Sequence, residues 1–122
     1  MHVDWFSRLT LLLAGLLGAS GVAAAAASSH VGGALLEPLA LIALTHAQAM
    51  LAFGLSRPEA AGLRIGALGI GVGALVFVAD LAVRQFWEQS VFAYAAPAGG
   101  IAMMAGWAIV AFSGLLLRSQ RP

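Results

Sequence analysis

The chain is dominated by four long apolar stretches that are separated by short, more polar segments. They run from about residue 9 to 27, from 39 to 55, from 63 to 83 and from 98 to 117. A helix that crosses the hydrocarbon core of a bilayer, roughly 30 Å thick, needs about 20 largely apolar residues. Each stretch is close to that length. The sequence therefore predicts an all-α integral membrane protein in which residues 1–122 form a single transmembrane domain.

The segments between the stretches are short and carry helix-start and turn signals. Pro38 suits the first turn of a second helix, because a proline there lacks only an N–H that would have no partner in the helix. Ser56 and Glu59 have the S-x-x-E spacing of a capping box, which predicts that the third helix begins there. Pro97 is expected to open the fourth helix. Short loops make consecutive helices antiparallel neighbours, so we expect an up-down-up-down four-helix bundle.

The composition agrees with lipid as the main solvent of the side chains. Hydrophobic residues make up 61% of the chain and charged residues 9%, and the mean hydropathy is +0.96. Soluble domains are about 45–50% apolar and about 25% charged. The chain has no cysteine, which excludes disulfides and thiolate metal sites. A net charge of +1 argues against nucleic acid as a partner, because that role needs a strongly basic face.

The arginines are distributed unevenly between the two sides of the expected bundle. Five of them fall on the side that carries both termini: Arg8, Arg57, Arg64, Arg118 and Arg121. Arg84 is the single arginine on the other side. Because cytoplasmic segments of membrane proteins carry an excess of positive residues, both termini are expected in the cytoplasm. A cleaved secretory signal peptide is the alternative for the first stretch, since Arg8 precedes an apolar core that ends in alanines.

Two polar side chains lie near the middle of the second stretch, His46 and Gln48. Ionisable residues within a membrane are costly and are candidates for function. One interpretation of His46 is a neutral imidazole that is hydrogen-bonded to a neighbouring helix. A second is a proton relay or a substrate contact, and a third is axial ligation of a haem or a chlorophyll-type pigment. The sequence does not require any cofactor.

Charged residues gather at the expected outer end of the bundle. Asp80 and Arg84 are four residues apart on the third helix and therefore share a face, which predicts an ion pair. With His46 and Gln48 they form a candidate intramembrane polar site. A candidate outer patch, suited to docking or to a polar vestibule, consists of His30, Glu37 and Glu88.

Small residues recur at four-residue spacing on three of the stretches. Such residues let membrane helices approach closely, so we expect them at seams inside the bundle, with a homodimer face as the alternative. The candidate helix-packing glycines are Gly15, Gly18, Gly69, Gly73, Gly99, Gly100 and Gly106. Sequence motifs of metalloproteases, serine hydrolases and nucleotide-binding loops are missing, and the loops are too short for an active site. We therefore predict no catalytic residues and no metal site, and a membrane enzyme is the least favoured of the functions.

The segment Pro97-Ala-Gly-Gly-Ile-Ala-Met-Met-Ala-Gly-Trp107 resembles the P-x-G-G-x-x-F-x-x-G-W signature of the YgdD-like family of small bacterial inner-membrane proteins. His30, after a helix that ends in small residues, is similar to that family's G-A-F-G-A-H segment. His46 and the residues after it resemble its Y-H-x-L-A segment. Where the family has F-S-G-S-L-Y, this chain has Phe77-Val-Ala-Asp80-Leu-Ala. The resemblance implies four spans and an inner-membrane location, and it implies no activity, because the family's function is unknown.

Three functions fit these features. The first is an accessory or structural subunit that docks onto a larger membrane protein complex, which suits the short loops and the many small residues. The second is a small transporter or channel, as a homo-oligomer, that uses His46, Gln48, Asp80 and Arg84 along a polar path. The third is a haem- or pigment-binding subunit with His46 as axial ligand.

Overall fold

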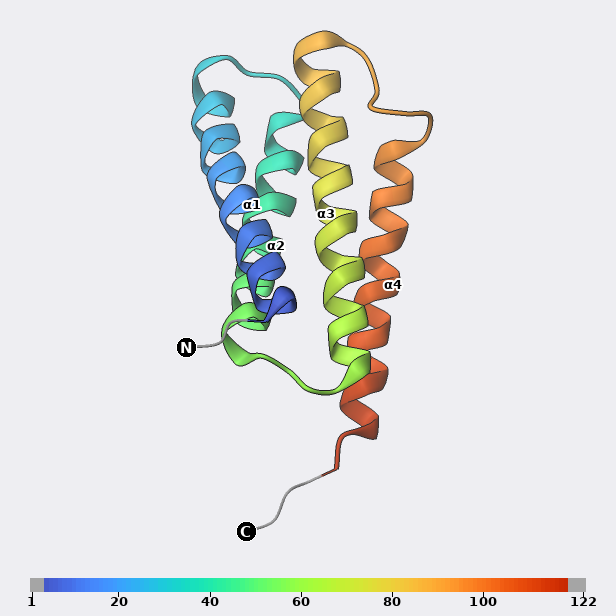
Figure 1. Cartoon of the computed structure of the whole chain (residues 1–122). Coiled ribbons are helices and arrows are strands. Elements are labelled where there is room, and N and C mark those ends of the chain that lie inside the picture. Colours follow the sequence, from blue (N-terminus) through green and yellow to red (C-terminus); the bar gives the residue numbers. More distant parts are fainter. Residues whose placement is uncertain (1–3, 119–122) are drawn as a thin grey trace.

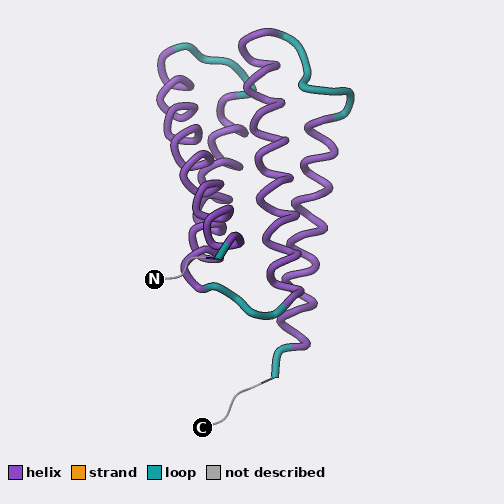
Figure 2. Tube along the Cα trace, in the orientation of Figure 1, coloured by secondary structure: helices purple, strands orange, loops and turns teal. Residues whose placement is uncertain are grey.

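Residues 4–118, which the computed structural model describes, form four α-helices joined by short loops (Figure 1; Figure 2). These are α1 (Trp5–His30), α2 (Leu36–Ser56), α3 (Ala61–Trp87) and α4 (Ala95–Leu116). Each helix is long and apolar enough to cross a membrane, which confirms the predicted all-α architecture. The chain is accordingly a multi-pass membrane protein. Arg121, which entered the orientation argument, lies outside the described residues.

The helix ends follow from local backbone geometry. α1 begins after Asp4, whose carboxylate accepts the backbone N–H of Ser7 at 2.8 Å and so caps the helix. α2 ends at Ser56, because Arg57 takes a left-handed backbone conformation with φ 49°. The predicted capping box is therefore wrong. Ser56 is the last residue of α2, and α3 starts at Ala61 after an extended Ala60 that makes no side-chain cap.

The helices are arranged as two antiparallel hairpins, α1 with α2 and α3 with α4 (Figure 1). α3 also packs against α2 and α1 and so joins the hairpins. The start of α1, the α2–α3 loop and the end of α4 lie at one end of the bundle, and the other two loops lie at the opposite end. This confirms the up-down-up-down order. Which end faces the cytoplasm stays a prediction.

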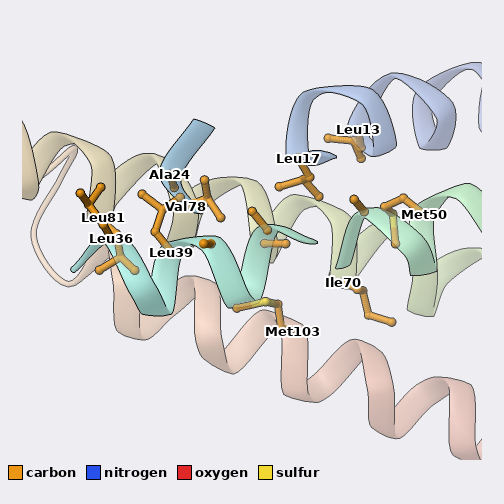
Figure 3. Packing of buried hydrophobic residues seen from close by; sticks show 14 residues of the cluster. Leu13, Leu17, Ala24, Leu36, Leu39, Met50, Ile70, Val78, Leu81 and Met103 are labelled. Atoms are coloured by element: carbon orange, nitrogen blue, oxygen red, sulfur yellow. The ribbon is translucent and has the colours of Figure 1, made fainter. Parts of the chain in front are cut away.

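α4 lies at the edge of the bundle. Its backbone approaches α3 closely, whereas no α-carbon of α4 is within 8 Å of one in α1 or α2. The main core lies between α1, α2 and α3, where Leu17, Met50 and Ile70 are fully buried. Met103 extends this core by reaching from α4 into the space between α4 and α2 (Figure 3). One side of α4 is thus tied to the bundle, and most of its surface has no protein neighbour in the described part of the chain.

Glycines bring α3 and α4 into backbone contact. A Cβ added to Gly73 would lie 2.7 Å from the carbonyl oxygen of Gly99, and one added to Gly99 would lie 2.7 Å from the carbonyl oxygen of Gly73. About two turns after Gly99 on α4, a Cβ on Gly106 would lie 2.7 Å from the carbonyl oxygen of Gly66. Apolar helices gain little from the hydrophobic effect in lipid and associate largely through such close contacts. These glycines therefore account for how tightly the second hairpin packs.

The other candidate packing glycines have looser surroundings. An added Cβ would be 3.5 Å from the nearest atom at Gly69 and 3.8 Å at Gly18, which is ordinary van der Waals contact. At Gly15 and Gly100 it would meet nothing within 4 Å, because Gly15 is exposed on α1 and Gly100 borders the open groove between α2 and α4. Gly15 and Gly100 therefore lie outside the seams at which the sequence placed them.

Candidate functional site

His46 projects from α2 toward α4 and is half-buried. Its Nε2 accepts the indole N–H of Trp107 at 3.2 Å, and its Nδ1 lies 2.9 Å from the carbonyl oxygen of Ile42. An indole N–H can only donate, so Nε2 must carry the lone pair and Nδ1 the proton. His46 is thus a neutral imidazole with both nitrogens hydrogen-bonded. The bond to Trp107 connects two helices whose backbones do not touch.

This pair lies in a groove between α2 and α4 with a volume of about 330 Å³. Its lining residues come from α2, α3 and α4: Ile42, His46, Phe77, Gly100, Met103, Met104 and Trp107. The imidazole and the indole supply the groove's polar side-chain atoms, and the rest of the wall is apolar. The groove can therefore accommodate an acyl chain or an apolar side chain, and a ligand that needs the imidazole nitrogen must first displace the indole.

Asp80 is fully buried toward the end of α3 that leads into the α3–α4 loop, and its carboxylate accepts three hydrogen bonds. Arg84 donates through Nε at 2.8 Å, which confirms the predicted i, i+4 ion pair. The backbone N–H groups of Val91 and Ala96 donate at 3.0 and 3.1 Å. Tyr94, the residue before α4, makes no side-chain cap, so Asp80 supplies a cap to α4 from another helix. The carboxylate fixes the α3–α4 loop.

The predicted polar path is not assembled within the described residues. Gln48 lies two positions from His46 and is exposed on a different face of α2, because two residues turn a helix by about 200°. Asp80 and Arg84 are paired with each other beside the α3–α4 loop. His30, Glu37 and Glu88 are exposed at the same end of the bundle, at the end of α1, the start of α2 and the end of α3. No hydrogen bond or ion pair joins these three within residues 4–118.

A second polar cluster, which sequence reasoning missed, lies at the end where α1 begins. The guanidinium of Arg64 pairs with the Asp4 carboxylate and lies 4.8 Å from the centre of the Phe6 ring. The backbone N–H of Ser7 and, to a smaller extent, the Arg64 charge lower the pKa of Asp4 below its ordinary value. The two partners are 60 residues apart, so only the fold brings them together.

Asp4 and Arg64 also border a polar hollow of about 320 Å³. Arg57, Pro58 and Glu59 of the α2–α3 loop complete its lining. Two arginines and two carboxylates balance one another there, so the hollow has no evident preference for an anion. In residues 4–118, no group of three or more His, Asp or Glu side chains is placed to hold a metal ion. Protein-family models, curated proteins and solved structures give no match to the chain.

Proposed function

We propose that this protein is an accessory or structural subunit that docks onto a larger membrane protein complex, with α4 as its docking helix. The observation that supports this most is the contrast between how firmly α4 is held and how little of it is covered. The Asp80 carboxylate, the His46 imidazole and the glycine contacts with α3 all fix its position. Its outer surface nevertheless has no neighbour among the described residues.

The uncovered side of α4 offers large apolar side chains for such a contact, Ile101, Phe112 and Leu115, with Met104 at the margin of the groove. A surface that is already held in place loses little conformational freedom on binding, which favours association. The ionisable groups within the helices support the same proposal. Asp80 and His46 are engaged in contacts between segments of the chain, and this use is structural. The partner we propose is an integral membrane protein that presents an apolar helix to α4.

Site-specific photo-cross-linking in the native membrane tests this proposal. A photoreactive residue at Ile101 or Phe112 on α4 should give a defined adduct with one other membrane protein. The same residue at Leu12 or Val22, which are exposed on α1, serves as the matched control and should label lipid. The adduct should weaken when Ala108 on the same side of α4 is replaced by Trp. Adducts with lipid alone at every position would contradict the proposal.

A cofactor-binding subunit is the second candidate, because His46 shares its groove with Met103 and Met104. Histidine and methionine are both axial ligands of haem. Ligation would require Nε2 to release the Trp107 indole. Titration of the purified chain with haem, followed by its visible spectrum, tests this candidate. A spectral shift that is lost in His46→Ala would support it, and an unchanged haem spectrum would exclude it.

The inner-membrane location, the cytoplasmic termini and membership of the YgdD-like family belong to the same proposal. The arginine distribution and the Pro97–Trp107 segment support them. Because the chain has no cysteine, single cysteines at Glu59 and at Gln89 can report the two sides. We expect a membrane-impermeant thiol reagent, added from outside, to label Gln89→Cys and to spare Glu59→Cys. The reverse pattern would contradict the orientation.

A further inference from the structure

One face of α2 is turned away from the bundle, and its residues recur at a regular spacing along the helix. Five residues form this face, which we call the α2 outer face: Leu41, Thr45, Gln48, Ala52 and Leu55. All five are exposed, Leu41 by 63% and Leu55 by 68%. Their spacing alternates between four and three residues, which is the pattern of helices that pack as a left-handed coiled coil. His46, by contrast, lies on the side of α2 that faces the groove.

Gln48 is the feature of this face that lipid alone does not explain. Its carboxamide is exposed and has no hydrogen-bond partner in residues 4–118. Gln48 is eight residues before Ser56, the end of α2, which corresponds to about 12 Å along the helix axis. Its side chain is too short to reach water from there. An amide without water or a partner is unfavourable in hydrocarbon, so this group calls for a partner outside the chain.

The chemistry of a carboxamide favours a second copy of the same chain. The group has one acceptor oxygen and an NH₂ donor. Across a two-fold axis the same residue meets itself, so two Gln48 side chains can form two reciprocal N–H···O bonds. Thr45 does not compete as a donor to the carboxamide oxygen, because its hydroxyl already donates to the Leu41 carbonyl oxygen at 2.7 Å. Thr45 and Ala52 are small enough on either side of Gln48 to let the two helices approach.

We propose that the protein forms a parallel homodimer through the α2 outer face, with the paired Gln48 carboxamides at its centre. Glu37 continues the face beyond Leu41 at the end of the helix, where helices that cross at about 20° diverge and water is present. This contact leaves α4 and the groove uncovered. The inference therefore goes beyond the proposed docking function, and either one can fail without the other.

The dimer is tested with the purified full-length chain in liposomes at graded protein-to-lipid ratios. Dimerisation is measured by energy transfer between labelled copies. We expect Gln48→Leu to weaken dimerisation by about 3- to 30-fold, which corresponds to the range measured for polar contacts between membrane helices. Gln48→Asn keeps the carboxamide and is the matched control, and it should retain most of the affinity. Helicity should stay unchanged in both variants, since the Gln48 side chain is exposed and makes no hydrogen bond within the described chain.

Disulfide trapping provides an independent test of which face is used. Under mild oxidation Ala52→Cys should form a symmetric cross-linked dimer. Val72→Cys, at an exposed position of α3, should not. A chain that is monomeric at every ratio, or a dimer with the same affinity in Gln48→Leu, would overturn the proposal. Cross-linking of Ala52→Cys to a different protein in native membranes, without the symmetric dimer, would overturn it as well. None of these outcomes affects the adducts expected from α4.

Discussion

Replacing Gly73 by alanine tests whether backbone contact holds α4 in place. The added Cβ would lie 2.7 Å from the Gly99 carbonyl oxygen and 2.8 Å from the Met103 backbone nitrogen. Both are backbone atoms of α4, so only a separation of the two helices can relieve the clash. Overpacking of this kind costs about 1–3 kcal/mol. Alanine is favoured over glycine inside a helix by about 0.5–1 kcal/mol. We therefore expect Gly73→Ala to lower the free energy of unfolding by about 1 kcal/mol, since the gain in helix propensity offsets part of the overpacking cost.

Two matched substitutions on the same pair of helices separate this effect from helix propensity. The Cβ of Gly69→Ala would make an ordinary contact at 3.5 Å, and that of Gly100→Ala would meet nothing within 4 Å. Both variants should be as stable as the parent chain or slightly more stable. The measurement is reversible unfolding in mixed micelles, followed by circular dichroism as the denaturing detergent is increased. If Gly73→Ala proves as stable as Gly100→Ala, the reasoning about backbone contact is wrong.

Three further predictions concern the polar contacts. Asp80→Ala removes the acceptor of three hydrogen bonds and should destabilise the chain by about 1–3 kcal/mol in the same unfolding assay, because backbone donors lose their partner; an unchanged midpoint would show that the α3–α4 loop does not depend on this carboxylate. Trp107→Phe removes one hydrogen bond and should cost about 0.5–1.5 kcal/mol, whereas Trp87→Phe, at an exposed position without such a bond, should cost nothing measurable. Because folding lowers the pKa of Asp4, its stabilising contribution is complete above the unfolded pKa and is lost as the pH falls through the folded pKa. Thermal unfolding should therefore show that the folded chain loses stability as the pH falls from about 5 to about 2. Asp4→Asn should remove that part of the pH dependence.

The spans and their order could be predicted from the sequence, because bilayer thickness sets the length of each apolar stretch and short loops make successive helices antiparallel. The Asp80–Arg84 pair was predictable for a similar local reason, since residues four apart on a helix are neighbours. The two backbone donors to Asp80 were not, because they depend on how the α3–α4 loop folds back.

Contacts between distant segments could not be predicted from the sequence pattern. His46 and Trp107 are 61 residues apart, and their meeting depends on how α2 and α4 are rotated about their axes. Apolar side chains surround most of each helix, so the pattern alone carries little information on that rotation. The capping box at Ser56 failed for a different reason. The motif requires Ser56 to cap the start of α3. Ser56 is instead the last residue of α2, because the left-handed conformation of Arg57 ends that helix.

The three donors to the Asp80 carboxylate bear on how the chain enters the membrane during synthesis. All of them follow Asp80 in the chain, and the last is Ala96, 16 residues later. A translocation channel that released α3 into lipid by itself would release a carboxylate before its backbone donors had emerged. We therefore expect α3 to wait beside the channel until the first turn of α4 has been made, so that both helices leave as a pair.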